Sequence, residues 1–146
     1  MTEYATIIAA TIAALASMVS LLLNTKLTIN REKRKILWSK EIDRFIELEE
    51  NCGILTEYLL SYGYSDEEKK QKYRDNAQYI RIASGRFRRY QNVLQALRDF
   101  ENRAGIYISE LGQQNTREED EEYRSHIEKT FYSLINACDK AVDRPK

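Results

Sequence analysis

Residues 5–23 read ATIIAATIAALASMVSLLL, an apolar stretch without a charge, a glycine or a proline. As a helix, these nineteen residues measure about 28 Å, close to the hydrocarbon thickness of a bilayer. They predict a transmembrane segment at residues 1–25. A cleaved signal peptide fits less well, because Glu3 stands where such a peptide carries positive charge. A buried core helix is the other alternative, but the rest of the chain is too short to surround it.

The charges on the two sides of this stretch predict its orientation. Glu3 precedes it, and six basic residues follow it within the next seventeen positions. Because positive loops stay in the cytoplasm, we expect a single-pass protein of the inner (cytoplasmic) membrane with its N-terminus outside and residues 26–146 inside. This topology and anionic lipid headgroups together explain the basic cluster at residues 31–35. The six residues are Lys26, Arg31, Lys33, Arg34, Lys35 and Lys40.

Small and weakly polar side chains gather on one side of the predicted membrane helix, and large aliphatic ones on the other. Within a bilayer, helices approach closely where side chains are small and where hydroxyl or amide groups can bond across the contact. The small side therefore predicts a helix contact, most simply in a homo-oligomer. It forms either a dry seam or the lining of a water-filled path, and the lack of an intramembrane charge favours the seam. The face consists of Thr6, Ala9, Ala13, Ser17, Ser20 and Asn24.

The chain after the membrane segment is rich in helix signals. Apolar residues recur every three or four positions from Ile36 to Tyr62, which predicts a helix over about 30–62 that continues the membrane helix without a break. Gly63 suits a left-handed helix end, and Ser65 with Glu68 forms a capping box for a following antiparallel helix.

Two more helices complete the predicted bundle. The second covers about 66–104, with a kink or a close helix contact expected at Gly85. Thr116 and Glu119 form another capping box, so a third helix is expected over about 117–141. The predicted fold class is all-α: one N-terminal transmembrane helix that continues into an antiparallel cytoplasmic bundle of about three helices.

Catalytic and metal-binding signatures are missing from the sequence. One histidine, His126, and two cysteines, Cys52 and Cys138, do not form a metal set, and no phosphate loop or nucleophile motif is present. We expect neither an enzyme nor a cofactor. The 23 basic residues are balanced by 23 acidic ones, so duplex nucleic acid is not an expected partner.

Five arginines gather on the second predicted helix, three of them spaced seven residues apart at about 10 Å per step. Guanidinium groups bind phosphates and carboxylates through paired donors, and a nearby tyrosine can stack on a base. This pattern predicts a site for an anionic small molecule. The alternative is a solvated face paired with glutamates of a neighbouring helix. The candidate ligand-binding residues are Arg74, Arg81, Arg86, Arg88, Arg89 and Tyr79.

In architecture alone, a small-residue membrane helix on a helical cytoplasmic domain resembles the small membrane effectors of prokaryotic antiphage defence, some of which respond to cyclic nucleotides. The resemblance assigns no residues. It implies an oligomeric membrane effector or sensor that acts at the membrane. Its cytoplasmic bundle would bind a partner protein or an anionic signal, such as a nucleotide. The alternative function is a passive tether or scaffold that recruits a cytoplasmic protein.

Overall fold

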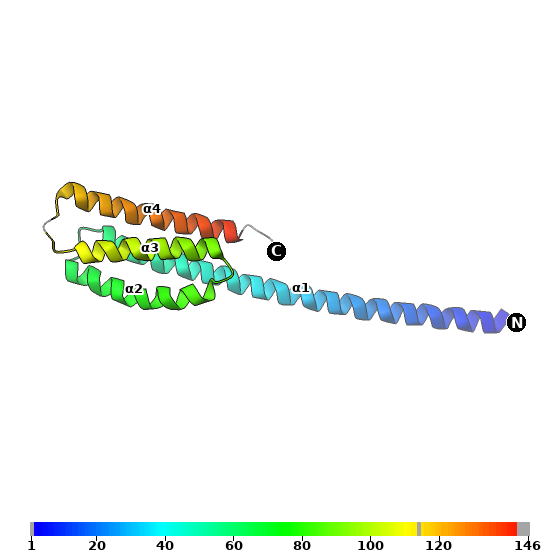
Figure 1. Ribbon diagram of the computed structural model, residues 1–146. Coiled ribbons are helices and arrows are strands. Elements are labelled where there is room, and N and C mark those ends of the chain that lie inside the picture. The colour runs from blue at the N-terminus through cyan, green and yellow to red at the C-terminus, as the bar shows by residue number, and fades with distance from the viewer. Residues whose placement is uncertain (1, 114, 143–146) are drawn as a thin grey trace. The chain divides into compact units, whose positions relative to one another are not determined.

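The computed structural model describes residues 2–113 and 115–142, with side chains described from residue 15 onward. Four helices make up this described part: α1 (Thr2–Leu60), α2 (Asp66–Arg86), α3 (Gln91–Glu110) and α4 (Arg117–Val142) (Figure 1). The same ranges contain no strand, so the predicted all-α class is confirmed.

The chain forms two compact units, Met1–Ile42 and Asp43–Lys146, and α1 contributes to both. In the second unit, the last part of α1 lies beside α2, α3 and α4 in a helical bundle (Figure 1). This bundle has four helical segments, where the sequence predicted about three.

The predicted transmembrane segment lies partly outside the described side chains, because the description of side chains excludes residues 1–14. Within the residues that are described, no helix is both long enough and apolar enough to cross a membrane.

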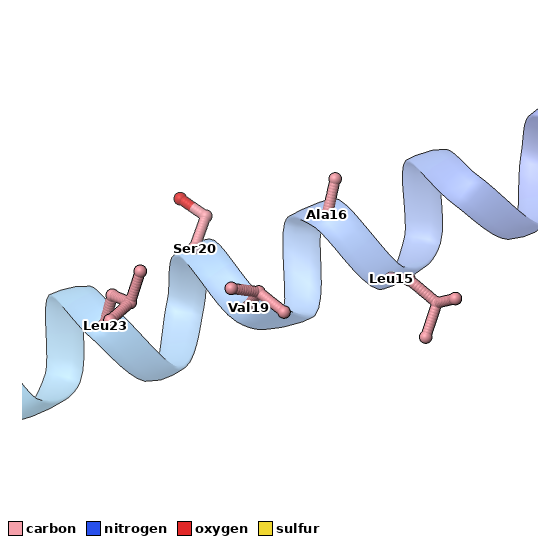
Figure 2. A pocket seen from close by; sticks show the side chains of 5 residues that line it. All are labelled: Leu15, Ala16, Val19, Ser20 and Leu23. Atoms are coloured by element: carbon pink, nitrogen blue, oxygen red, sulfur yellow. The ribbon is translucent and has the colours of Figure 1, made fainter.

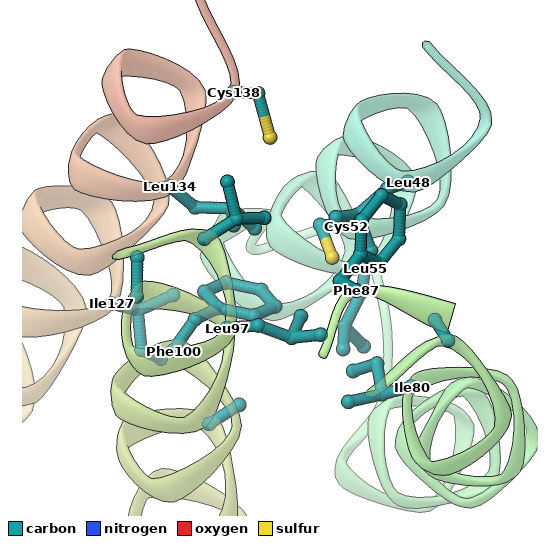
Figure 3. Packing of buried hydrophobic residues seen from close by; sticks show 14 of the residues in the cluster. Leu48, Cys52, Leu55, Ile80, Phe87, Leu97, Phe100, Ile127, Leu134 and Cys138 are labelled. Atoms are coloured by element: carbon teal, nitrogen blue, oxygen red, sulfur yellow. The ribbon is translucent and has the colours of Figure 1, made fainter. Parts of the chain in front are cut away.

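The bundle core forms from apolar side chains that recur every three or four residues along each helix. On α1, the predicted apolar face is buried from Phe45 onward. Phe45 itself is 2 % exposed, whereas Ile36, nearer the N-terminus, is 57 % exposed. Figure 3 shows side chains from all four helices meeting in this core. The residues labelled there are Leu48, Cys52, Leu55, Ile80, Phe87, Leu97, Phe100, Ile127, Leu134 and Cys138.

The connection between α1 and α2 contains the predicted capping box. The Ser65 hydroxyl accepts a hydrogen bond from the Glu68 backbone N–H, and the Glu68 carboxylate accepts one from the Ser65 backbone N–H at 2.7 Å. The left-handed backbone predicted for Gly63 is wrong, because Gly112 is the described glycine with a positive φ, at 89°. Gly63 instead donates its N–H to the Ser61 hydroxyl at 3.1 Å.

The helix predicted over residues 66–104 is divided into α2 and α3 by a turn at residues 87–90. The expectation of a kink or a close helix contact at Gly85 was wrong: α2 ends at the next residue, and no heavy atom outside the adjoining residues and the helix's own backbone lies within 4 Å of a Cβ built on this glycine. Glycine weakens a helix by about 1 kcal/mol relative to alanine, and here it directly precedes the last residue of α2. Beyond the turn, α3 runs back beside α2 and buries Leu97 and Phe100.

The start of α4 follows the prediction. The Glu119 backbone N–H donates to the Thr116 hydroxyl at 3.2 Å, and the Thr116 backbone N–H donates to the Glu119 carboxylate at 2.8 Å. Both ends of the capping box are therefore present, and α4 begins at Arg117 as expected.

Candidate functional site

The five candidate arginines are exposed residues of α2 and of the turn that follows it, and they are called here the arginine surface. Arg74, Arg81 and Arg86 lie on α2, and Arg88 and Arg89 lie in the turn that follows it. Their side chains are spread along the helix rather than gathered at one point, because each seven-residue step advances about 10 Å. The surface therefore suits an elongated anion or another charged helix better than a single phosphate.

Two members of the arginine surface pair with glutamates, Arg74 within α2 and Arg86 across to α1; the second is the kind of pair that the alternative interpretation expected. An Arg74 Nη atom lies 3.6 Å from a Glu67 carboxylate oxygen, and Arg86 lies 3.8 Å from Glu47 on α1. The Arg74 and Glu67 side chains are both more than half exposed, so this pair contributes at most about 1 kcal/mol.

The other three members, Arg81, Arg88 and Arg89, make no ion pair with any described residue. All three are exposed. The unneutralised part of the arginine surface thus extends from the middle of α2 to the α2–α3 turn, and an added anionic group can reach it without displacing a partner.

Tyr79, the aromatic candidate, lies on the same side of α2 as Arg86 and faces away from Arg81. Its phenol shares a side-chain hydrogen bond with Asn51 of α1, and its ring packs against the core. Burial is the largest cause that raises the pKa of Tyr79 to about 12, followed by the charge of Glu47. Arg81 lies two residues further on, about 200° around the helix, so the two side chains leave α2 in nearly opposite directions. Tyr79 therefore belongs with Arg86 and Glu47 at the contact of α2 with α1, and not with Arg81.

The predicted oligomer face on α1 is described in part. Thr6, Ala9 and Ala13 lie outside the residues whose side chains are described, and Ser17, Ser20 and Asn24 are exposed. Figure 2 shows the side chains that line a shallow, open groove on this part of α1. It is an indentation on the side of one helix, and it places Ser20 among apolar neighbours. The groove is lined by Leu15, Ala16, Val19, Ser20 and Leu23.

A cluster that the sequence reasoning missed contains Lys69, which is only 5 % exposed. Its Nζ atom lies 3.5 Å from the Tyr107 hydroxyl and 5.8 Å from the centre of that ring. Burial lowers the pKa of Lys69, and the nearby charge of Arg124 lowers it further. The Cζ atom of Arg124 lies 3.9 Å from the centre of the Tyr62 ring, and an Nη atom of Arg124 lies 3.9 Å from an Asp120 carboxylate oxygen.

This cluster was not predicted because Lys69 stands in the run DEEKK, which has the composition of a solvated first helical turn. Nothing local to that run indicates that α3 and α4 cover it. The signal available in the sequence was the helical period, because Lys69 lies four residues before Tyr73 and eleven before Ile80, on the apolar side of α2.

Replacing Lys69 with methionine is expected to leave the free energy of unfolding unchanged or to raise it by about 1 kcal/mol, because a buried ammonium with one long hydrogen bond loses hydration without full compensation. The measurement is urea unfolding of the full chain in mild detergent at pH 7, followed by far-UV circular dichroism. Lys129→Met, at an exposed position on α4, is the matched control. A loss above about 2 kcal/mol at Lys69 alone would contradict this expectation.

The difference in stability between Lys69→Met and the wild type should depend on pH in a defined direction. The pKa of Lys69 is lower in the folded chain, so the unfolded chain binds more protons between the folded pKa and the ordinary lysine pKa. Wild-type stability therefore rises with pH through that window. Any advantage of Lys69→Met should shrink as the pH approaches the ordinary lysine value.

The two cysteines are buried in the bundle core, at 0 % exposure each. Burial raises the pKa of both Cys52 and Cys138 to about 12, which keeps the thiols protonated and unreactive at neutral pH. Across the described parts of the chain, no group of three His, Cys, Asp or Glu residues is arranged to hold a metal ion.

Comparisons with protein-family models, curated proteins and solved structures found no match.

Proposed function

We propose that this chain is a single-pass protein of the inner membrane that self-associates through its N-terminal helix and acts as an oligomeric effector or sensor. Residues 1–25 cross the bilayer with the N-terminus outside, and the bundle lies in the cytoplasm. There the arginine surface binds an anionic group, on a signal molecule or a partner protein, and this binding alters how the membrane helices associate.

The observation that carries this proposal is the aliphatic surface of α1 in the first unit. Leu15, Met18, Leu21 and Leu22 are each 59 to 69 % exposed. Proteins in water rarely leave so many neighbouring aliphatic side chains uncovered. A bilayer accepts them, and a helix satisfies its own backbone hydrogen bonds there. In the sequence, this surface continues the uncharged run that begins at residue 5.

The link between membrane and bundle also supports an active role. Residues 24–42 contain neither glycine nor proline, and α1 is one helix through the boundary between the two units. A helix without a breaker resists bending, so a displacement of the bundle can be passed to the membrane segment.

The test is the topology of the full chain in cells. We expect it to remain with membranes after an alkaline carbonate wash. An impermeant maleimide should label Glu3→Cys in cells with a permeable outer membrane, and should label Lys129→Cys only after the inner membrane is opened. The native cysteines are suitable background because both are fully buried. Release by carbonate, or the reverse labelling pattern, would refute the proposal.

A further inference from the structure

A row of three acidic residues lies on the outer side of α1. Asp43, Glu50 and Glu57 are spaced seven residues apart, and all three are exposed. Glu50 lies about 200° around the helix from the fully buried Cys52, so it points away from the core. Within the described chain none of the three makes an ion pair. We call them the acidic row.

Three members of the arginine surface repeat the same spacing. Arg74, Arg81 and Arg88 are also seven residues apart and exposed, and we call them the basic row. The two rows have equal spacing in the sequence and opposite charges; the acidic row lies wholly on α1, and Arg88 of the basic row lies in the turn that follows α2.

The two rows also lie at matching heights along the bundle. Three contacts fix how α1 and α2 align: the Lys72 ammonium lies 4.9 Å from the centre of the Tyr58 ring, Asn51 bonds to Tyr79, and the Phe45 and Phe87 rings lie 5.1 Å apart. These helices are antiparallel, so a step back along α1 and a step forward along α2 lead the same way.

Each acidic residue is therefore level with one arginine. Glu57 lies one residue before Tyr58 on α1, and Arg74 lies two residues after Lys72 on α2. In the same way, Glu50 lies one residue before Asn51, and Arg81 lies two residues after Tyr79. Asp43 and Arg88 are two and one steps from the contact of Phe45 with Phe87. All three pairs match within one residue, and for the two pairs whose members both lie on helices this is about 1.5 Å along the axis.

The rows do not meet inside one chain. Arg81 lies on the side of α2 opposite Tyr79, which faces α1. The acidic row faces outward from α1. A second copy can bring them together, because a rotation about an axis parallel to the bundle, with no shift along it, keeps level residues level.

We propose that the partner of the basic row is the acidic row of a second copy of this chain. The copies pack in parallel, with Arg74 against Glu57, Arg81 against Glu50 and Arg88 against Asp43. The contact joins two different faces, so it can repeat from copy to copy around a ring or along an array. The parallel arrangement rests on the proposed function, because chains anchored in one membrane with one orientation must lie parallel.

Charge exchange at the central pair tests the proposal. Arg81→Glu alone and Glu50→Arg alone each place like charges opposite one another, and should each weaken self-association of the full chain in mild detergent by about tenfold. The double variant Arg81→Glu/Glu50→Arg restores opposite charges at every contact, and should recover the wild-type affinity. Sedimentation equilibrium gives the dissociation constants, and raising the salt concentration should weaken the wild-type contact. Arg103→Glu and Glu128→Arg, at exposed positions outside both rows, should have no effect.

Two results would overturn the inference. If both single variants associate like the wild type, the rows do not meet. If Arg81→Glu weakens association, Glu50→Arg does not and the double variant fails to recover, the arginines bind a different anion; the proposed function then survives without this partner. Failure of the proposed function is recognised separately, as release of the wild-type chain from membranes by carbonate.

Disulfide formation between mixed chains checks the parallel register. Arg88→Cys chains should cross-link to Asp43→Cys chains and not to Glu57→Cys chains, because Glu57 lies two seven-residue steps away along the row. Efficient cross-linking of Arg88→Cys to Glu57→Cys alone would show an antiparallel contact and contradict the proposal.

Discussion

Replacing Phe100 with alanine is expected to lower the free energy of unfolding by about 3–5 kcal/mol. The Phe100 side chain is 0 % exposed, and its ring centre lies 6.0 Å from that of Phe131 on α4. Truncation leaves a cavity between α3 and α4, the pair of helices that pack most closely in the bundle. The full chain in mild detergent, unfolded with urea and followed by far-UV circular dichroism, gives the measurement.

Two further variants separate cavity formation from loss of an aromatic ring. Phe100→Leu keeps most of the volume and should cost less than about half as much as alanine. Tyr132→Ala removes a ring that is 57 % exposed, and should change stability by less than about 1 kcal/mol. Equal losses at Phe100 and Tyr132 would mean that the α3–α4 contact does not form the core.

Features that depend on residues close together in the sequence, such as where a helix begins, could be predicted from the sequence. Ser65 with Glu68 and Thr116 with Glu119 start α2 and α4 as expected, because a capping box is a contact between residues three apart. The apolar period of α1 likewise identified its buried side from Phe45 onward. These features depend on local chemistry, which a single sequence contains.

The division of α2 from α3 could not be predicted in the same way. The period of apolar residues continues across Gly85, and one glycine costs too little to end a helix by itself. What favours the turn is tertiary: Phe87 and Tyr90 pack on Phe45, with ring centres 5.1 and 5.0 Å apart. Phe45 is distant in sequence, so the contact is visible only in the folded chain.

The arginine surface shows the same limit. Its seven-residue spacing was evident in the sequence, but the orientation of Tyr79 toward Asn51 and the pairing of Arg86 with Glu47 depend on how α1 and α2 align. The level of the acidic row depends on that alignment too. Seven-residue spacing recurs in any helix with charges beside an apolar face, so by itself it does not select a partner.

Placing an arginine at Leu15 is expected to remove most of the chain from the membrane. Residue 15 lies near the middle of the apolar stretch at residues 5–23, where an arginine costs about 2.5–3.5 kcal/mol to insert. That cost changes the ratio of inserted to uninserted chain by about a hundredfold. The fraction that resists carbonate extraction gives the measurement.

Thr25→Arg is the matched control, since it adds the same charge beyond the apolar stretch, at the end that we propose to face the cytoplasm and where Lys26 already stands. It should insert like the wild type, because arginine there agrees with the expected orientation and its side chain can reach the headgroups. If Leu15→Arg and Thr25→Arg both remain in the membrane, the aliphatic surface of α1 is covered by protein, and the residues around Leu15 do not contact lipid. If Leu15→Arg alone is lost from the membrane fraction, the bilayer itself covers this surface. Anchoring through α1 would then keep neighbouring chains parallel, as the contact between the basic row of one chain and the acidic row of the next requires.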